Sequence, residues 1–154
     1  MHQNKNYNPD YCIDGDSIIQ LSDGRIISYY FRKSDIITIY NQNTFESILT
    51  IDLWDITIKE KLKVFDIYLT KVNSIIEIND NLLLVVFYQF LIEIYLKEKT
   101  FEYKIVYKSE DNILNINQLL DKRIVLITSY DIKIIYKDKN QFERPIYYKR
   151  KLEA

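Results

Sequence analysis

The chain has 154 residues, a formal net charge of −1 and a hydrophobic content of 47%. This length can bury the core of one domain, and the content of apolar residues excludes an intrinsically disordered chain. The near-zero charge excludes a protein that binds nucleic acid through its overall field, and a single cysteine excludes an internal disulfide.

The N-terminus and the apolar stretches carry no membrane or export signal. The first residues, MHQNKNYNPDYC, lack the apolar core of a signal peptide, and the longest uncharged run, at 81–92, is too short to span a bilayer. We therefore expect a cytoplasmic protein without membrane or nucleic-acid partners. The polar segment 1–11 is expected to be a flexible tail, and 149–154 a C-terminal tail.

The first structured elements are predicted to be four short strands, at 17–21, 25–30, 36–40 and 45–51. Each is rich in β-branched and aromatic residues, and polar clusters separate them. The connection SDGR, at 22–25, has the composition of a tight hairpin turn, because Asp hydrogen-bonds to its own backbone and glycine tolerates positive φ.

The segment 52–71 follows these strands. Its sequence, DLWDITIKEKLKVFDIYLTK, alternates apolar and polar residues through much of its length. This period of two predicts an extra hairpin at 52–71 rather than a linker.

The remainder of the chain repeats the first four strands twice. A marker Asp is followed by a Phe at nearly constant distance: Asp23 to Phe45, Asp80 to Phe101 and Asp121 to Phe142 are 22, 21 and 21 residues apart. We predict a single domain at 12–148, with four-stranded units at about 12–51, 72–111 and 112–148. The run LLLVVF in the second unit is expected to be buried on both faces.

The repeat resembles the WD40-like β-propeller family. The resemblance lies in IIQLSDGRIIS, DIITIYNQNTFE and DIKIIYKDKNQFE, and it covers about 16–148. It implies an all-β, β-propeller-like fold with three four-stranded antiparallel blades, and essentially no helix.

The chain departs from the family at its two best-known dipeptides. The Gly-His pair is missing, since His2 is the sole histidine, and Trp54-Asp55 lies outside the repeat register. The Trp-Asp pair that closes the third strand is replaced by Tyr40-Asn41, Tyr95-Leu96 and Tyr136-Lys137.

No catalytic, cofactor or metal site is predicted. Cys12 is interpreted as a structural thiol, because the sole histidine is remote in sequence. Asp14 and Asp16 have the spacing of calcium ligands without the rest of the loop, so a turn is the favoured interpretation. The segment YYKRK at 147–151 is interpreted as a solvated strand end in preference to a nucleic-acid contact.

One face of the propeller is predicted to bind a partner. The loops 30–35, 87–90 and 128–131 open on the same face, which gathers the candidate residues Tyr30, Phe31, Arg32, Phe87, Tyr88, Phe90 and Tyr130. Tyr, Phe and Arg are typical anchors of protein interfaces. The alternative is that these rings pack inside the blades. If they bind, alanine at Arg32 and Tyr88 is expected to weaken capture of the partner without loss of stability.

These features favour a non-enzymatic module for protein interaction or self-assembly. A propeller that binds a small ligand or glycan, or a propeller enzyme, is the first alternative, and a purely structural component is the second. Three blades cannot close a ring, so we expect a homodimer with a six-bladed ring, unless the segment 52–71 caps one end.

Overall fold

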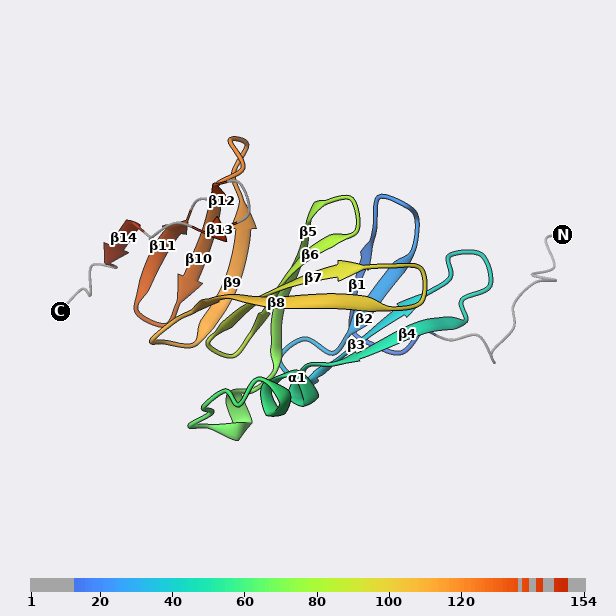
Figure 1. The fold of residues 1–154 in the computed structure, drawn as a ribbon, viewed down its shortest axis with the longest axis horizontal. Coiled ribbons are helices and arrows are strands. Elements are labelled where there is room, and N and C mark those ends of the chain that lie inside the picture. The colour runs from blue at the N-terminus through green and yellow to red at the C-terminus, as the bar shows by residue number, and fades with distance from the viewer. Residues whose placement is uncertain (1–12, 136, 139–140, 143–145, 150–154) are drawn as a thin grey trace, which may run out of the picture.

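The computed structural model of the chain describes residues 13–135, 137–138, 141–142 and 146–149. They form an all-β structure with three antiparallel sheets and little helix (Figure 1). The predicted tail 1–11, Cys12 and residues 150–154 lie outside the described residues.

The sheets follow the chain in order. Sheet 1 consists of β1 (Ser17–Gln20), β2 (Ile26–Tyr29), β3 (Ile36–Tyr40) and β4 (Ser47–Asp52), and sheet 2 of β5 (Val72–Asn79), β6 (Leu82–Phe87), β7 (Phe90–Leu96) and β8 (Phe101–Lys108). Sheet 3 consists of β9 (Ile113–Gln118), β10 (Ile124–Thr128), β11 (Asp131–Ile135) and β14 (Ile146–Lys149), and a separate hairpin pairs β12 (Lys137–Asp138) with β13 (Gln141–Phe142). The predicted arrangement of four consecutive strands is confirmed for the first two units. In the third, a hairpin precedes the fourth strand.

The marker Asp shapes the turn that follows the first strand of a unit. In sheet 1 the Asp23 carboxylate accepts the backbone N–H of Arg25 at 3.0 Å, and in sheet 3 Asp121 accepts that of Arg123 at 3.2 Å. The next residue has a left-handed backbone in every unit, with φ of +95° at Gly24, +63° at Asn81 and +74° at Lys122. The structure therefore repeats where the sequence does.

Sheet 2 lies between the other two sheets. Leu83, Val85 and Phe87 of β6 belong to a core shared with Ile27, Ile37 and Ile39 of sheet 1. The alternate residues Leu84 and Val86 belong to a second core, shared with Ile116, Ile124 and Leu126 of sheet 3. All five residues from Leu83 to Phe87 are fully buried, which confirms the prediction for this strand.

The predicted hairpin at 52–71 is wrong. The segment contains helix α1 (Leu53–Lys59) and the short 3₁₀ helix η1 (Ile67–Leu69). The Asp52 carboxylate caps α1 by accepting the backbone N–H groups of Trp54 at 3.0 Å and Asp55 at 3.2 Å. Lys59 pairs with Asp55 at 2.9 Å, one helical turn away.

Helix α1 closes the core between sheets 1 and 2 at one end. Leu53 and Ile56, three residues apart, are buried in that core, and Leu62 and Val64 pack against it. The helix therefore packs at the junction of two sheets. Among the described residues, the segment 52–71 does not form the end cap that was the alternative to a dimer.

Candidate functional site

The loops predicted to share a face lie at one end of the sheets. The backbone N–H of Arg32, in the β2–β3 loop, donates to the Val72 carbonyl at 2.9 Å, which ties the loop to the start of β5. The N–H of Ile113 donates to the Tyr88 carbonyl at 3.0 Å, and the N–H of Ser129 to the Asn112 carbonyl at 3.2 Å. These bonds place the β6–β7 and β10–β11 turns on either side of Asn112 and Ile113, at the start of β9.

Three of the predicted partner-binding rings are not on the surface. Phe87 and Phe90 are fully buried between sheets 1 and 2, and Tyr88 is 4% exposed. Phe87 and Phe90 are directly opposed across the two-residue turn, so both rings point into the same core. Tyr88 has φ of +58° and packs edge-on against Phe90, with centroids 6.2 Å apart. Their placement on an exposed face is corrected: for these rings, packing inside the sheets is observed.

The β2–β3 loop does present its side chains. Tyr30 and Phe31 are 39% and 40% exposed, and the Arg32 guanidinium lies 4.7 Å from the centre of the Phe31 ring. Two acids hold the loop: Asp16 accepts the Phe31 backbone N–H at 2.7 Å, and Asp14 accepts the Tyr30 hydroxyl. That hydrogen bond raises the pKa of Tyr30. Asp14 and Asp16, considered as calcium ligands, thus serve here as hydrogen-bond acceptors for the loop.

The segment from Phe65 to Leu69 adds exposed apolar side chains at the same end. Their exposed fractions are 81% for Phe65, 58% for Ile67, 86% for Tyr68 and 42% for Leu69. The turn is fixed by Asp66, whose carboxylate accepts the Tyr68 backbone N–H at 3.0 Å. Sequence reasoning missed this segment because the alternation of Phe65, Ile67 and Leu69 predicted a strand with one buried side.

A hollow of about 210 Å³ joins the two groups of exposed side chains. It is lined by Arg32, Tyr68, Leu69, Lys71, Asn73, Asn112 and Leu114. Its floor is fixed, because the Asn73 side-chain amide donates to the Ile113 carbonyl at 2.7 Å. Among the ion pairs of residues 13–135, none involves Arg32 or Lys71. The hollow therefore combines two cations with apolar and amide groups.

We define the loop face as the surface formed by this hollow and the side chains beside it: Phe31, Arg32, Phe65, Ile67, Tyr68, Leu69, Lys71 and Tyr130. Tyr130 is 66% exposed, and its turn is bonded to Asn112 of the hollow. Of the seven residues predicted from the sequence, Phe31, Arg32 and Tyr130 belong to the loop face, and Tyr30 borders it.

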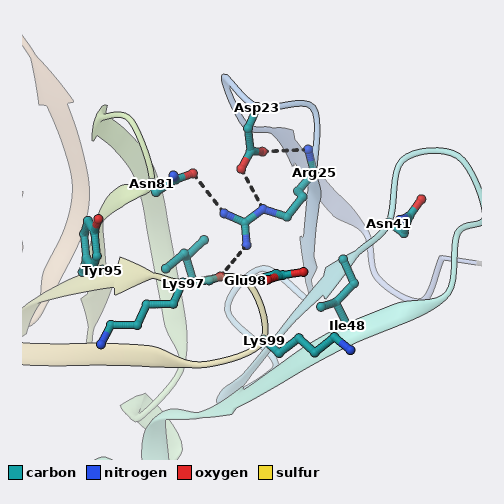
Figure 2. Close-up of a pocket in the computed structure, with 10 residues that line it drawn as sticks. Asp23, Arg25, Asn41, Ile48, Asn81, Tyr95, Lys97, Glu98 and Lys99 are labelled. Carbon is teal, nitrogen blue, oxygen red and sulfur yellow. Dashed lines mark hydrogen bonds and ion pairs between the residues drawn. The ribbon is translucent and has the colours of Figure 1, made fainter.

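A larger hollow of about 810 Å³ lies at the other end, between the turns of sheets 1 and 2 (Figure 2). The Arg25 guanidinium dominates it: Nε contacts Asp23 at 2.8 Å, one Nη donates to the Asn81 side chain at 2.9 Å, and the other to the Lys97 carbonyl at 2.8 Å. Because all three donor groups have partners, Arg25 serves as a bridge between the sheets.

Replacing Arg25 with Ala is expected to lower the free energy of unfolding by about 1–3 kcal/mol, because hydrogen bonds of a charged group, 15% exposed, are lost. Urea denaturation measures the change. Lys99→Ala is the control, since Lys99 lines the same hollow and is exposed. Equal midpoints for the two variants would show that the bridge contributes nothing.

The residues that the structure describes contain no group of three or more His, Cys, Asp or Glu residues that could hold a metal ion. No helix among them is long and apolar enough to cross a membrane.

Comparisons with known proteins bear on the fold. No protein-family model matches the chain, and no curated protein matches it. It is similar to a solved structure from B. thetaiotaomicron, described as the extracellular domain of a hybrid two component system, with a TM-score of 0.57 and 19% identity. The match covers 92% of this chain, which spans 18% of the length of the other.

Proposed function

We propose that this chain is a non-enzymatic, protein-binding module of the WD40-like β-propeller type, with the loop face as its binding site. One observation carries the proposal: four large apolar side chains between Phe65 and Leu69 are exposed beside Arg32 and Lys71. Clusters of exposed apolar residues on soluble proteins mark interaction sites. Aromatic residues and Arg are enriched in protein interfaces.

The propeller assignment is supported by the way the sheets succeed one another. Sheets 1 and 2 are each a meander of four consecutive strands, and each sheet packs face to face against the next. Propeller blades are four-stranded sheets repeated in this manner. In the structural neighbour the matching segment is 18% of the chain, so there the similar fold is one part of a longer chain.

The chemistry of the loop face favours an acidic polypeptide segment with apolar side chains. Arg32 and Lys71 line the hollow, and no Asp or Glu does. Tyr68, Leu69 and Leu114 offer apolar contact, while the amides of Asn73 and Asn112 can bond to a peptide backbone. A carboxylate beside Arg32 would gain a charge-assisted hydrogen bond.

Two pools of synthetic peptides test the proposal. Both vary one aromatic and one aliphatic position, and their charged positions are Asp and Glu in one pool and Lys and Arg in the other. We expect the acidic pool to bind, and Tyr68→Ala or Arg32→Glu to weaken binding by about thirtyfold or more, as at interface hot spots. Fluorescence anisotropy measures the affinity.

Lys99→Glu supplies the matched control, since it changes an exposed cation at the opposite hollow. It should leave peptide affinity unchanged. Tyr88→Ala is no longer suitable as a binding variant, because its buried ring contributes to stability. Equal binding of both pools, or full binding by Arg32→Glu and Tyr68→Ala, would contradict the proposal.

A further inference from the structure

Each sheet turns the same repeat positions toward the sheet that follows it in the chain. Leu84, Val86 and Leu91 of sheet 2 are the residues that face sheet 3. The repeat positions 41 residues later are Val125, Ile127 and Ile132 of sheet 3. These three do not belong to the core between sheets 2 and 3, to which the alternate residues Ile124 and Leu126 belong. Sheet 3 thus carries on its outer face the side chains that sheet 2 uses to hold its neighbour.

The strand pairing supports this equivalence. Val86 is directly opposite Leu91 in sheet 2, as Ile127 is opposite Ile132 in sheet 3. Val125 is likewise opposite Ile134. We define the donor face as Val125, Ile127, Ile132 and Ile134. All four are half-buried, form two adjacent cross-strand pairs and carry no polar atom.

The outer face of sheet 1 is the corresponding receiving surface. Sheet 1 packs on sheet 2 through Ile27, Ile37 and Ile39, so the alternate residues point the other way. Among these, Ile18 is 61% exposed and Ile36 is 40% exposed. Ile26 is half-buried and lies three residues after its marker Asp, the position that Leu83 has in sheet 2. Since Leu83 faces the preceding sheet, Ile26 is expected to face outward from sheet 1. We define the acceptor face as Ile18, Ile26, Ile36 and Thr38.

Residues 14–16 cover part of the outer side of sheet 1. Ser28 Oγ donates to the Asp14 carbonyl at 2.6 Å, and the Asp14 N–H donates to the Tyr40 hydroxyl oxygen at 3.2 Å. Ser28 and Tyr40 are buried as a result. Ile18 and Ile36 retain their exposure in spite of this segment, so the acceptor face stays open at these two positions.

We propose that the donor face of one copy of this chain packs against the acceptor face of a second copy, which continues the stacking of sheets from chain to chain. A second copy is the occupant that the structure favours, because it brings the face that follows in the repeat. The contact would be continuous with the two sheet junctions already within the chain. The loop face has no part in it.

The turn residues agree with this arrangement. In sheet 1, Arg25 is held by Asp23 at 2.8 Å and reaches the Asn81 turn of the next sheet. In sheet 3, Arg123 is held by Asp121 at 2.6 Å in the same way. The assembly would place Arg123 against the β1–β2 turn of the second copy, just as Arg25 lies against the β5–β6 turn of sheet 2 within one chain.

The contact joins the donor face of one copy to the acceptor face of another. Two copies form a closed assembly only if the donor face of the second copy also packs against the acceptor face of the first. Two copies related by a twofold axis do so and bring six sheets together, within the range of about four to eight blades seen in propellers. Each chain would then use both of its outer faces, and both junctions would be identical.

Two variants of the full chain test the inference. The donor variant carries Ile127→Glu and Ile132→Glu, and the acceptor variant carries Ile18→Lys and Ile36→Lys. We expect the unaltered chain to have twice the 18.6 kDa of one chain in light scattering, and each variant alone to have the mass of one chain. An equimolar mixture of the two should regain the double mass, because one junction then joins two unaltered faces and the other joins the Glu residues of the donor variant to the Lys residues of the acceptor variant.

Leu120→Glu is the control, since it adds a charge at a fully exposed turn residue and should leave the mass unchanged. Far-UV circular dichroism checks the fold; if the donor variant loses its β spectrum, Ile127→Thr with Ile132→Thr replaces it. A single-chain mass for the unaltered protein would overturn the inference. So would an acceptor variant that still dimerises alone, or a mixture that fails to associate.

Discussion

Replacing Phe90 with Ala is expected to lower the free energy of unfolding by about 3–5 kcal/mol, the range for removing a buried phenylalanine ring. The Phe90 side chain is fully buried in the core between sheets 1 and 2, where it packs against Tyr88 and lies opposite Phe87. Its removal leaves a cavity that the close-packed strands of sheet 2 can fill only partly. Chemical denaturation followed by circular dichroism gives the difference.

Phe65→Ala is the matched control for this prediction. The same ring is removed, but Phe65 is 81% exposed, so the change in stability is expected to stay within about 0.5 kcal/mol. A Phe90 variant as stable as the Phe65 variant would mean that the ring is not in the core and that the predicted exposed face was right.

Leu91→Ala is expected to destabilise the fold by about 2–5 kcal/mol, because Leu91 is fully buried between sheets 2 and 3. Ile132 occupies the same repeat position on the donor face, where it is half-buried and belongs to neither of the two cores. Ile132→Ala should therefore cost little in dilute solution. If the second copy covers Ile132, its cost should rise with protein concentration.

Denaturation at several protein concentrations measures both variants. The loss for Leu91→Ala should be large at the lowest concentration, where the single chain prevails. Equal losses for the two variants at that concentration would contradict the difference in burial between sheets 2 and 3.

The repeat made most of the fold predictable from sequence. Strand bounds followed from short β-branched runs, and the Asp-based turns followed from the ability of an Asp side chain to bond to the backbone two residues on. The stacking of sheets could be expected because LLLVVF has no polar face to offer water. The propeller assignment itself stays a prediction, since the described residues establish only the sheets.

The predictions that were wrong, the hairpin at 52–71 and three exposed aromatic rings, have local physical causes. A period of two from Ile56 to Leu69 predicts strands, but Asp52 caps a helix whose buried residues, Leu53, Ile56 and Thr57, have the three- and four-residue spacing of one helix face. Phe87, Tyr88 and Phe90 are predicted at the surface because they lie in the segment 87–90 between two strands. The turn itself contains only Tyr88 and Gln89, so Phe87 and Phe90 stay in the strands and face the core, and the Tyr88 ring packs against Phe90.

The candidate site was predictable only in part for the same reasons. Tyr30, Phe31 and Arg32 stand out in sequence because their loop is longer than its counterparts. The segment from Phe65 to Leu69 lies outside the repeat, so no counterpart indicated its direction. Its alternating apolar residues are typical of a half-buried strand, whereas Asp66 caps a short turn that leaves them in solvent.

The molar mass of the unaltered chain over a range of protein concentrations tests most directly whether the sheets continue from one copy to the next. Sedimentation equilibrium at micromolar concentrations should give twice 18.6 kDa, with a shift toward the mass of one chain on dilution. A mass of 18.6 kDa at every concentration would contradict the account, and a steady increase beyond the dimer would contradict the closed pair.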